Sequence, residues 1–314
     1  MQTKALKDTT VFLPGLNGLR SIAAISVVIA HVTNQNLADF GFPNTFNFAL
    51  ADYGVTMFFV ISGFLITFLL LNEQLVSGTI LVSKFYLRRI LRIWPLYYFY
   101  IFIIIAFLYF SNKTDDIINE QLWFYVLFTA NIPTIAHNVI FLIAHYWSIG
   151  VEEQFYLFWP WFLKIKKSNL FQSIIIIICL FIITKFILYF TVGQASFSYR
   201  FLFYSRFQCM MIGALGGILF ITENKLFIKI FSSKFIQLLS WISFLLIGFN
   251  LIDIPYIISH EIISLASLSI IIGQLYADKK LINLDTKLFD VTGKNFVWNL
   301  YLSSNCNSIL VEHH

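Results

Sequence analysis

Long apolar runs separated by short polar connections dominate the pattern of hydrophobic and polar positions along the chain. Most runs approach the roughly 20 residues that a helix needs to cross the hydrocarbon core of a bilayer. They are continuous and lack the alternation of a membrane β-barrel, so they predict α-helices. The runs occupy residues 18–34, 50–71, 94–111, 148–163, 171–193, 204–222, 234–252, 254–276 and, less distinctly, 295–311.

The lysines and arginines between the runs predict the orientation of the chain, because cytoplasmic loops carry an excess of these residues. Residues 1–17 are basic, the loop after the first run has no Lys or Arg, and the loop after the second run is strongly basic. The N-terminus is therefore expected on the cytoplasmic side, with His31 toward the outer side. The residues that support this orientation are Lys4, Lys7, Arg20, Lys84, Arg88, Arg89 and Arg92.

The segment at residues 121–140 does not fit a regular series of spans. The third run starts at the cytoplasmic basic loop, so residue 120 is expected on the outer side, whereas Lys164 indicates the cytoplasmic side. An odd number of crossings must therefore join residue 120 to residue 164, although the interval has room for only two. Either the segment, which Asn131 and Pro133 interrupt, enters the bilayer without crossing it, or the charge rule fails for one basic cluster. Polar interruptions are tolerated where they line a protein cavity, which favours a re-entrant or interrupted segment.

The composition excludes an ordinary soluble domain, with 59% hydrophobic residues, 12% charged residues and a mean hydropathy of +0.79. No polar connection is long enough for a separate soluble domain, so residues 1–314 are predicted to form one all-α membrane-embedded domain. The net charge of +5 mostly reflects basic loops and does not imply a nucleic-acid partner. The three cysteines lie in apolar runs without metal-ligand spacing, and no metal is expected.

Arg20 and His31 are the most informative ionisable residues, because both lie on the first predicted helix. Eleven helical steps amount to three turns plus roughly 20°, so the two side chains share one face and lie roughly 16 Å apart along the axis. Ionisable groups inside a bilayer are functional candidates by default. The alternatives are a histidine that hydrogen-bonds to a neighbouring helix and an arginine that anchors the helix start.

Four strings of residues resemble one known family. They are LPGLNGLRSIAAISVVIAHV from residue 13, YGVTMFFVISGFLIT from residue 53, RRILRIWP from residue 88 and HYWSIGVEEQFYLFWP from residue 145. Together and in this order they resemble the acyltransferase 3 family of integral membrane acyltransferases. The resemblance implies about ten transmembrane helices with both termini inside, whereas the charge pattern gives nine spans and an outer C-terminus. The sequence after residue 290 departs from the family pattern, which implies an altered or truncated last helix.

The resemblance implies transfer of an acyl group, expected to be acetyl, from cytoplasmic acyl-CoA to a hydroxyl of a glycan or lipid-linked saccharide. The reaction is expected at a bacterial inner membrane, with no bound cofactor. His31 matches the family's catalytic histidine, and a neutral imidazole can take the proton from the attacking hydroxyl. Arg20, Arg89 and Arg92 are implied to bind the donor, since guanidinium groups suit phosphate recognition.

Glu152 matches the family's glutamate and is expected either to orient His31 or to pair with an arginine, because a carboxylate in an apolar run needs a partner. The further candidates are Arg88, Glu153, Tyr156 and Arg206, each with a structural alternative as a topology, interface or packing residue. Ser62 and Gly63 lack the context of a hydrolase nucleophile and are expected to serve helix packing. His260 and Glu261 match no motif.

Two other functions remain open on the sequence. A transporter or flippase for a glycan or small anion would also need arginines and glutamates along its path, although no paired halves are evident. An inactive membrane scaffold would be expected if the altered C-terminus removes activity. The appearance of an acyl group on an acceptor distinguishes the enzyme from both.

Overall fold

The computed structural model describes residues 13–31, 33, 48–111, 116–165, 169–276, 278–287 and 289, and the helices in this part of the chain confirm the all-α prediction. The chain forms two compact units. The first unit comprises Met1–Val76, Phe171–Ile183 and Arg206–His314, and the second comprises Ser77–Leu170 and Thr184–Ser205. The helix α7 (Leu170–Thr191) contributes to both.

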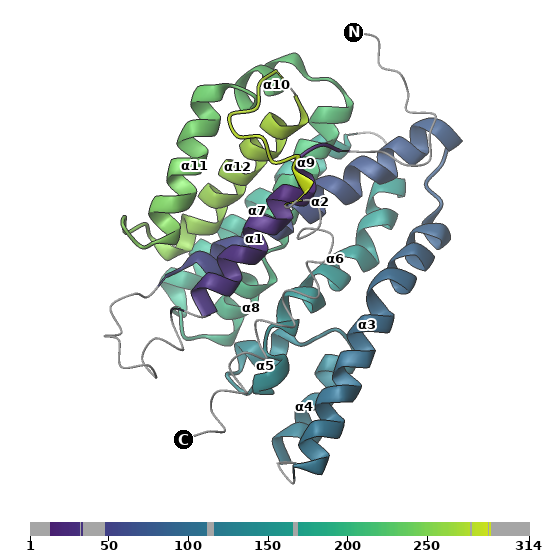
Figure 1. Cartoon of the computed structure of the whole chain (residues 1–314), viewed down its shortest axis with the longest axis vertical. Coiled ribbons are helices and arrows are strands. Elements are labelled where there is room, and N and C mark those ends of the chain that lie inside the picture. The colour runs from purple at the N-terminus through teal and green to yellow at the C-terminus, as the bar shows by residue number, and fades with distance from the viewer. Residues whose placement is uncertain are drawn as a thin grey trace. The chain divides into compact units, whose positions relative to one another are not determined.

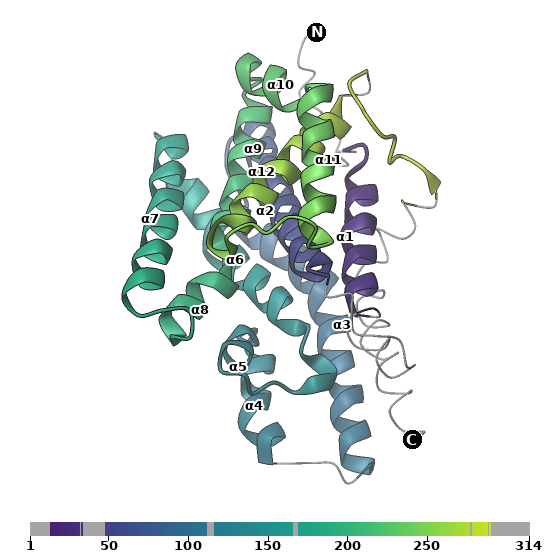
Figure 2. The same ribbon diagram turned by 90° about the vertical axis from the view of Figure 1, so that its left-hand side faces the viewer.

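The first unit is a bundle in which α12 packs against several other helices. It contacts α1, α9, α10 and α11, and Figure 1 shows α11 and α12 side by side. Figure 2 shows the short α10 beside the ends of α9 and α11. The helices of this unit are α1 (Leu16–His31), α2 (Leu50–Ser77, with its last residue in the second unit), α9 (Phe207–Ile221), α10 (Lys225–Phe231), α11 (Lys234–Gly248) and α12 (Tyr256–Leu275).

Glycines bring the backbones of α2 and α9 into contact. A Cβ atom on Gly63 would meet the backbone of Met210, and one on Gly213 would lie 2.9 Å from the Phe64 nitrogen and against the Val60 carbonyl. Helices in a bilayer gain stability from such close approach, because lipid supplies little hydrophobic force between them. The expectation that Gly63 serves helix packing is therefore confirmed.

The replacement Gly213→Ala is expected to destabilise the first unit by about 1–3 kcal/mol, since the new methyl group meets backbone that has no room to move. Gly216→Ala in the same helix is the matched control, because there the methyl group meets only the end of the Leu268 side chain, which can rotate. Thermal unfolding in detergent measures both. An equal loss in the two variants would contradict the backbone contact.

The second unit is built around the long helix α3 and an interrupted segment. Tyr97 and Tyr98 of α3 donate hydrogen bonds to the carbonyl groups of Tyr125 at 2.7 Å and Val126 at 2.9 Å, which ties α4 to α3. The short α5 contacts α4, α6 and α8. The helices are α3 (Val82–Phe110), α4 (Asp116–Val126), α5 (Asn131–Ile135), η2 (Phe141–Ile143), α6 (Tyr146–Ile165) and α8 (Phe197–Ser205).

Each apolar run up to residue 276 corresponds to a helix, and the segment at 121–140 is interrupted as predicted, with left-handed backbone at Phe128 and His137. Its depth in a bilayer stays a prediction. The run predicted at 94–111 is part of a longer helix, α3, which begins at Val82 and has Pro95 in its interior, because the basic residues before the run are also helical. The weak run at 295–311 lies outside the described residues.

Five described stretches of helix are long and apolar enough to cross a membrane, or six if the pair α10 and α11, bent by 54°, forms one span. The five are α2, α3, α7, α12 and the stretch Phe197–Ile221, which contains α8 and α9. The expected count of about ten is not confirmed. The helix α1 is shorter than the other candidates, and α6, which carries two glutamates, is not among them. Burial differs strongly between the candidate spans: 72% of the most apolar part of α2 and of α12 is buried inside the protein, against 17% for α7. The helix α7 therefore offers its apolar surface to lipid.

Candidate functional site

The helix α1 is continuous from Leu16 to His31, so Arg20 and His31 lie on one helix as predicted. Arg20 is half-buried near the helix start, and its Nη1 donates to Asn17 Oδ1 at 3.4 Å. His31 is the last residue of α1, and its side chain lies outside the described part of the structure. The roles of both residues stay predictions.

Hydrogen bonds connect the start of α1 with the segment after α12. The amide of Gly15 donates to Asp285 Oδ1 at 2.6 Å, and the Ser21 hydroxyl donates to the carbonyl oxygen of Phe289 at 2.6 Å. Asn17, which also accepts from Arg20, lines a cavity of about 230 Å³ between these two segments. Arg20 therefore lies beside a cavity at the end of α1 opposite His31.

Arg89 and Tyr156 lie at the centre of a polar cluster on α3 and α6 in the second unit. The Arg89 Cζ lies 4.4 Å from the centroid of the Tyr156 ring, and the Tyr156 hydroxyl donates to Glu152 Oε2 at 3.0 Å. Arg92, about one turn farther along α3, lies in electrostatic range of Arg89, Tyr156 and Glu152. The two helices thus bring together two cations, an aromatic ring and a carboxylate.

Glu153 contacts a different set of groups. Trp94 Nε1 donates to its Oε2 at 3.3 Å, while its Oε1 is buried without a hydrogen-bond partner among the described residues. The Nε2 of the next residue, Gln154, donates to the carbonyl of Phe128 at 2.8 Å and to Asn131 Oδ1 at 2.9 Å. These bonds connect α6 with the interrupted segment. The free oxygen of Glu153 can accept a hydrogen bond from a substrate.

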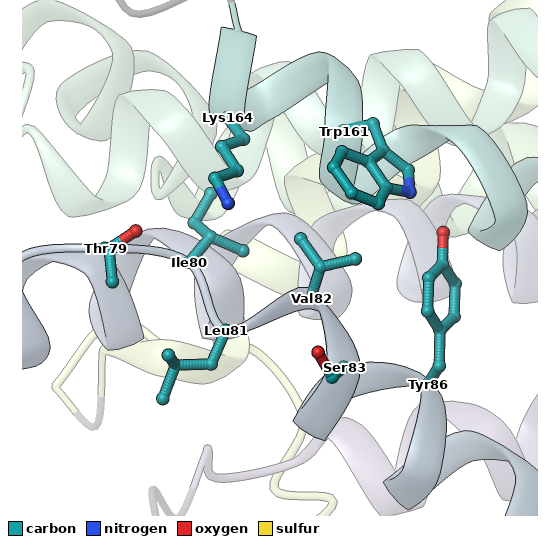
Figure 3. Close-up of a pocket in the computed structure, with 8 residues that line it drawn as sticks. All are labelled: Thr79, Ile80, Leu81, Val82, Ser83, Tyr86, Trp161 and Lys164. Atoms are coloured by element: carbon teal, nitrogen blue, oxygen red, sulfur yellow. The ribbon is translucent and has the colours of Figure 1, made fainter.

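A cavity of about 370 Å³ lies beside the Arg89 and Tyr156 cluster, where α3 begins. Figure 3 shows Tyr86 of α3 opposite Trp161 of α6, and Lys164 of α6 beside Ile80. The Lys164 Nζ lies 5.7 Å from the centroid of the Trp161 ring, and the Tyr86 hydroxyl donates to the carbonyl of Leu157. The other lining residues are Thr79, Ile80, Leu81, Val82 and Ser83.

Arg206 lies in the first unit and is fully buried. Its Nη2 donates to the Asp52 carboxylate, and its Nη1 donates to the Asp52 carbonyl at 2.9 Å and to Thr56 Oγ1 at 3.1 Å. The other Asp52 oxygen lies 2.8 Å from His260 Nε2 and accepts from the Tyr256 hydroxyl at 3.2 Å. Arg206 has a left-handed backbone with φ 47°, and these contacts hold it in that conformation. The cluster joins α2, α9 and α12.

The structure thus divides the predicted residues into separate groups. Arg89 and Arg92 of α3 lie with Glu152 and Tyr156 of α6, and Glu153 is also on α6. Arg88 and Arg92 are both exposed. Glu152 accepts a hydrogen bond from Tyr156 and lies in electrostatic range of Arg92, and both expectations for its role stay predictions. Its relation to His31 joins residues of different units and stays a prediction.

The partners of Arg206 were missed in the sequence. Asp52 and His260 are ionisable residues in helices long and apolar enough to span a membrane, which is a signal of function or pairing by itself. Asp52 and Thr56 are also four positions apart, so they lie on one face of α2 and can both reach Arg206.

The cluster on α3 and α6 has the chemistry of an anion site. Two guanidinium groups can bind phosphate oxygens, and the carboxylate and hydroxyl near them fix the side chains in place. No group of three or more His, Cys, Asp and Glu side chains is placed to hold a metal ion in the described part of the chain. The cluster on α3 and α6 offers charge, an aromatic ring and hydrogen-bonding groups for recognition.

Comparison with known proteins points to one family. A family model described as an acyltransferase domain matches residues 13–313. The O-acetyltransferase OatA of Staphylococcus aureus strain NCTC 8325 is 31% identical over 219 residues, which cover 65% of this chain and 34% of the relative. A protein of strain COL, provisionally named an O-acetyltransferase, is 34% identical over 158 residues, which cover 48% of this chain and 24% of the relative.

The matched part of this chain corresponds to about a third or less of the length of these relatives, 34% in OatA and 24% in the second protein. No solved structure was found to match. The similarity therefore concerns a membrane acyltransferase domain.

Proposed function

The chain belongs to the acyltransferase 3 family, and on this premise we propose that it transfers an acetyl group from acyl-CoA to a hydroxyl of a glycan or lipid-linked saccharide. The proposed location is the bacterial cytoplasmic membrane, with the N-terminus and the donor on the cytoplasmic side and the acceptor on the outer side. The positions of the basic residues support this orientation. The names of the relatives support acetyl as the group transferred.

One observation carries the donor assignment. Arg89 and Arg92 on α3 lie with Glu152 and Tyr156 on α6, at the end of α3 that its basic residues predict to be cytoplasmic. A CoA thioester carries a pyrophosphate, which paired guanidinium groups recognise well. In the proposed complex, Glu152 and Tyr156 hold the two arginines in position for it.

His31 is proposed to act as the general base. The acceptor hydroxyl attacks the carbonyl carbon of the thioester while the imidazole removes its proton, and the C–S bond then breaks. The proton returns from the imidazolium to the CoA thiolate, so that the products are the acetyl ester and free CoA thiol. General base catalysis of this kind contributes a factor of ~10²–10⁴ to the rate.

Mass spectrometry of surface glycans from cells with and without the gene tests the reaction. Loss of one acetyl unit from a glycan in the deletion strain, restored by the wild-type gene, is the expected result. Movement of a labelled saccharide across vesicles without covalent change would instead show a transporter. Stable insertion of the protein with neither activity would show an inactive scaffold.

The variant Arg89→Lys is expected to raise the KM for acetyl-CoA by about tenfold, because lysine keeps the charge but loses the planar fork that stacks on Tyr156 and binds phosphate. Arg88→Lys is the matched control, since Arg88 is exposed on the same helix. Steady-state kinetics with a fixed acceptor measures both variants. An unchanged KM in Arg89→Lys would remove Arg89 from the donor site.

A further inference from the structure

The cavity between the start of α3 and the end of α6 extends the donor site, and we propose that it binds the adenosine 3′-phosphate end of acyl-CoA. This inference rests on the proposed function, because it names where a second part of the same donor lies. The cavity of about 370 Å³ falls in the size range of small-molecule sites. It is lined by aromatic, cationic and hydroxyl side chains together with the aliphatic Ile80, Leu81 and Val82, and none of its lining residues is acidic.

The aromatic side chains fit a nucleobase. Trp161 is 48% exposed although it is a large apolar residue, and it faces the cavity together with Tyr86 (Figure 3). The Tyr86 hydroxyl is engaged by the Leu157 carbonyl, which fixes the ring at the cavity wall. Stacking of a base on an aromatic side chain contributes about 1–3 kcal/mol. Adenine is the part of CoA that offers such a face.

The cation fits a phosphate monoester. Lys164 is exposed, and its Nζ lies 5.7 Å from the centroid of the Trp161 ring. Lys164 therefore places a positive charge beside the aromatic surface of Trp161. The hydroxyl groups of Thr79 and Ser83 lie on the opposite wall (Figure 3). A lysine binds phosphate as a point charge, and hydroxyl groups supply additional donors.

The position of the cavity matches the order of groups along the donor. On α3, Tyr86 of the cavity and Arg89 of the cluster are three residues apart, so they lie on one face of the helix. On α6, Trp161 of the cavity follows Tyr156 of the cluster by five residues, or roughly 7.5 Å along the helix axis. The guanidinium cluster and the cavity are therefore successive positions along the same two helices. The pyrophosphate would lie at Arg89 and Arg92, and the adenosine 3′-phosphate at Trp161 and Lys164.

Binding of adenosine 3′,5′-bisphosphate to the full chain in nanodiscs tests the site without any need for acyl transfer. Isothermal titration is expected to show that Lys164→Ala weakens this ligand about tenfold, while 5′-AMP, which lacks the 3′-phosphate, binds both proteins with equal weakness. Trp161→Ala is expected to weaken both nucleotides, and Trp161→Phe to restore them. Lys229→Ala on α10, an exposed lysine of the other unit, is the control.

The donor assay separates this proposal from the reaction itself. Lys164→Ala is expected to raise the KM for acetyl-CoA but not for acetyl-dephospho-CoA, and to leave kcat unchanged. Equal effects on both donors, or no binding of the bisphosphate to wild-type protein, would overturn the nucleotide site while transfer by wild-type protein continued. If Lys164→Ala changed only the dependence on phosphatidylglycerol in the nanodisc, the occupant would be a lipid headgroup and the proposal would be wrong.

Discussion

Replacement of His31 by alanine is expected to lower kcat for acetyl transfer by a factor of ~10²–10⁴, because the acceptor hydroxyl loses the base that removes its proton. His31 ends α1, on the side opposite Arg20, so the loss should concern the acceptor chemistry rather than donor binding. The KM for acetyl-CoA is therefore expected to stay close to that of the wild-type protein.

The measurement is transfer of labelled acetyl to the acceptor by purified protein in liposomes, with insertion and thermal stability recorded for every variant. His137→Asn is the matched control, because His137 is exposed and has a left-handed backbone that asparagine tolerates. Full transfer by His31→Ala would refute the mechanism. Loss of both transfer and stability would assign His31 a structural role instead.

Replacement of Arg206 by alanine is expected to destabilise the protein by about 3–5 kcal/mol, because it leaves the Asp52 carboxylate and its hydrogen-bonding groups without their cation. The loss follows from burial: the Arg206 side chain is fully buried, and it donates to Asp52 and Thr56 of α2. The contact between α2 and the start of α9 should weaken most.

Thermal unfolding in detergent checks this result, with the exposed Arg88→Ala as control. The double variant Asp52→Asn with Arg206→Gln is expected to be less destabilised than the sum of the single variants, because neither charge is then left alone. Additive losses would show that the two residues stabilise the fold independently. A stable Arg206→Ala protein would contradict the buried ion pair.

The buried cluster also gives a physical reason for the left-handed conformation of Arg206. A residue with a side chain and positive φ is strained by about 1–3 kcal/mol and persists only where other contacts enforce it. Here hydrogen bonds from one guanidinium to the side chain and backbone of α2 enforce it. The cluster therefore fixes both the start of α9 and its distance from α2.

The sequence allowed the residues of the α3 and α6 cluster to be predicted, but not their arrangement. Glu152 could be identified because charges in apolar runs are rare, and Arg89 and Arg92 because their string resembles one family. That Arg89 stacks on Tyr156 and that Glu153 bonds to Trp94 depends on how α3 faces α6. The cavity with Trp161 and Lys164 was not predicted, since it lies between the start of α3 and the end of α6, which are far apart in the sequence.

The sequence by itself determined that this chain is a helical membrane acyltransferase domain, where its helices lie and which of them carry charge. These properties are local, because the length of an apolar run and the spacing of residues on a helix do not depend on distant parts of the chain. The tertiary structure alone decided which charges are neighbours. Gly63 and Gly213 let α2 and α9 approach, and only that approach places Asp52 beside Arg206. Pairing of buried charges is set by packing between residues far apart in the sequence, which no periodicity records.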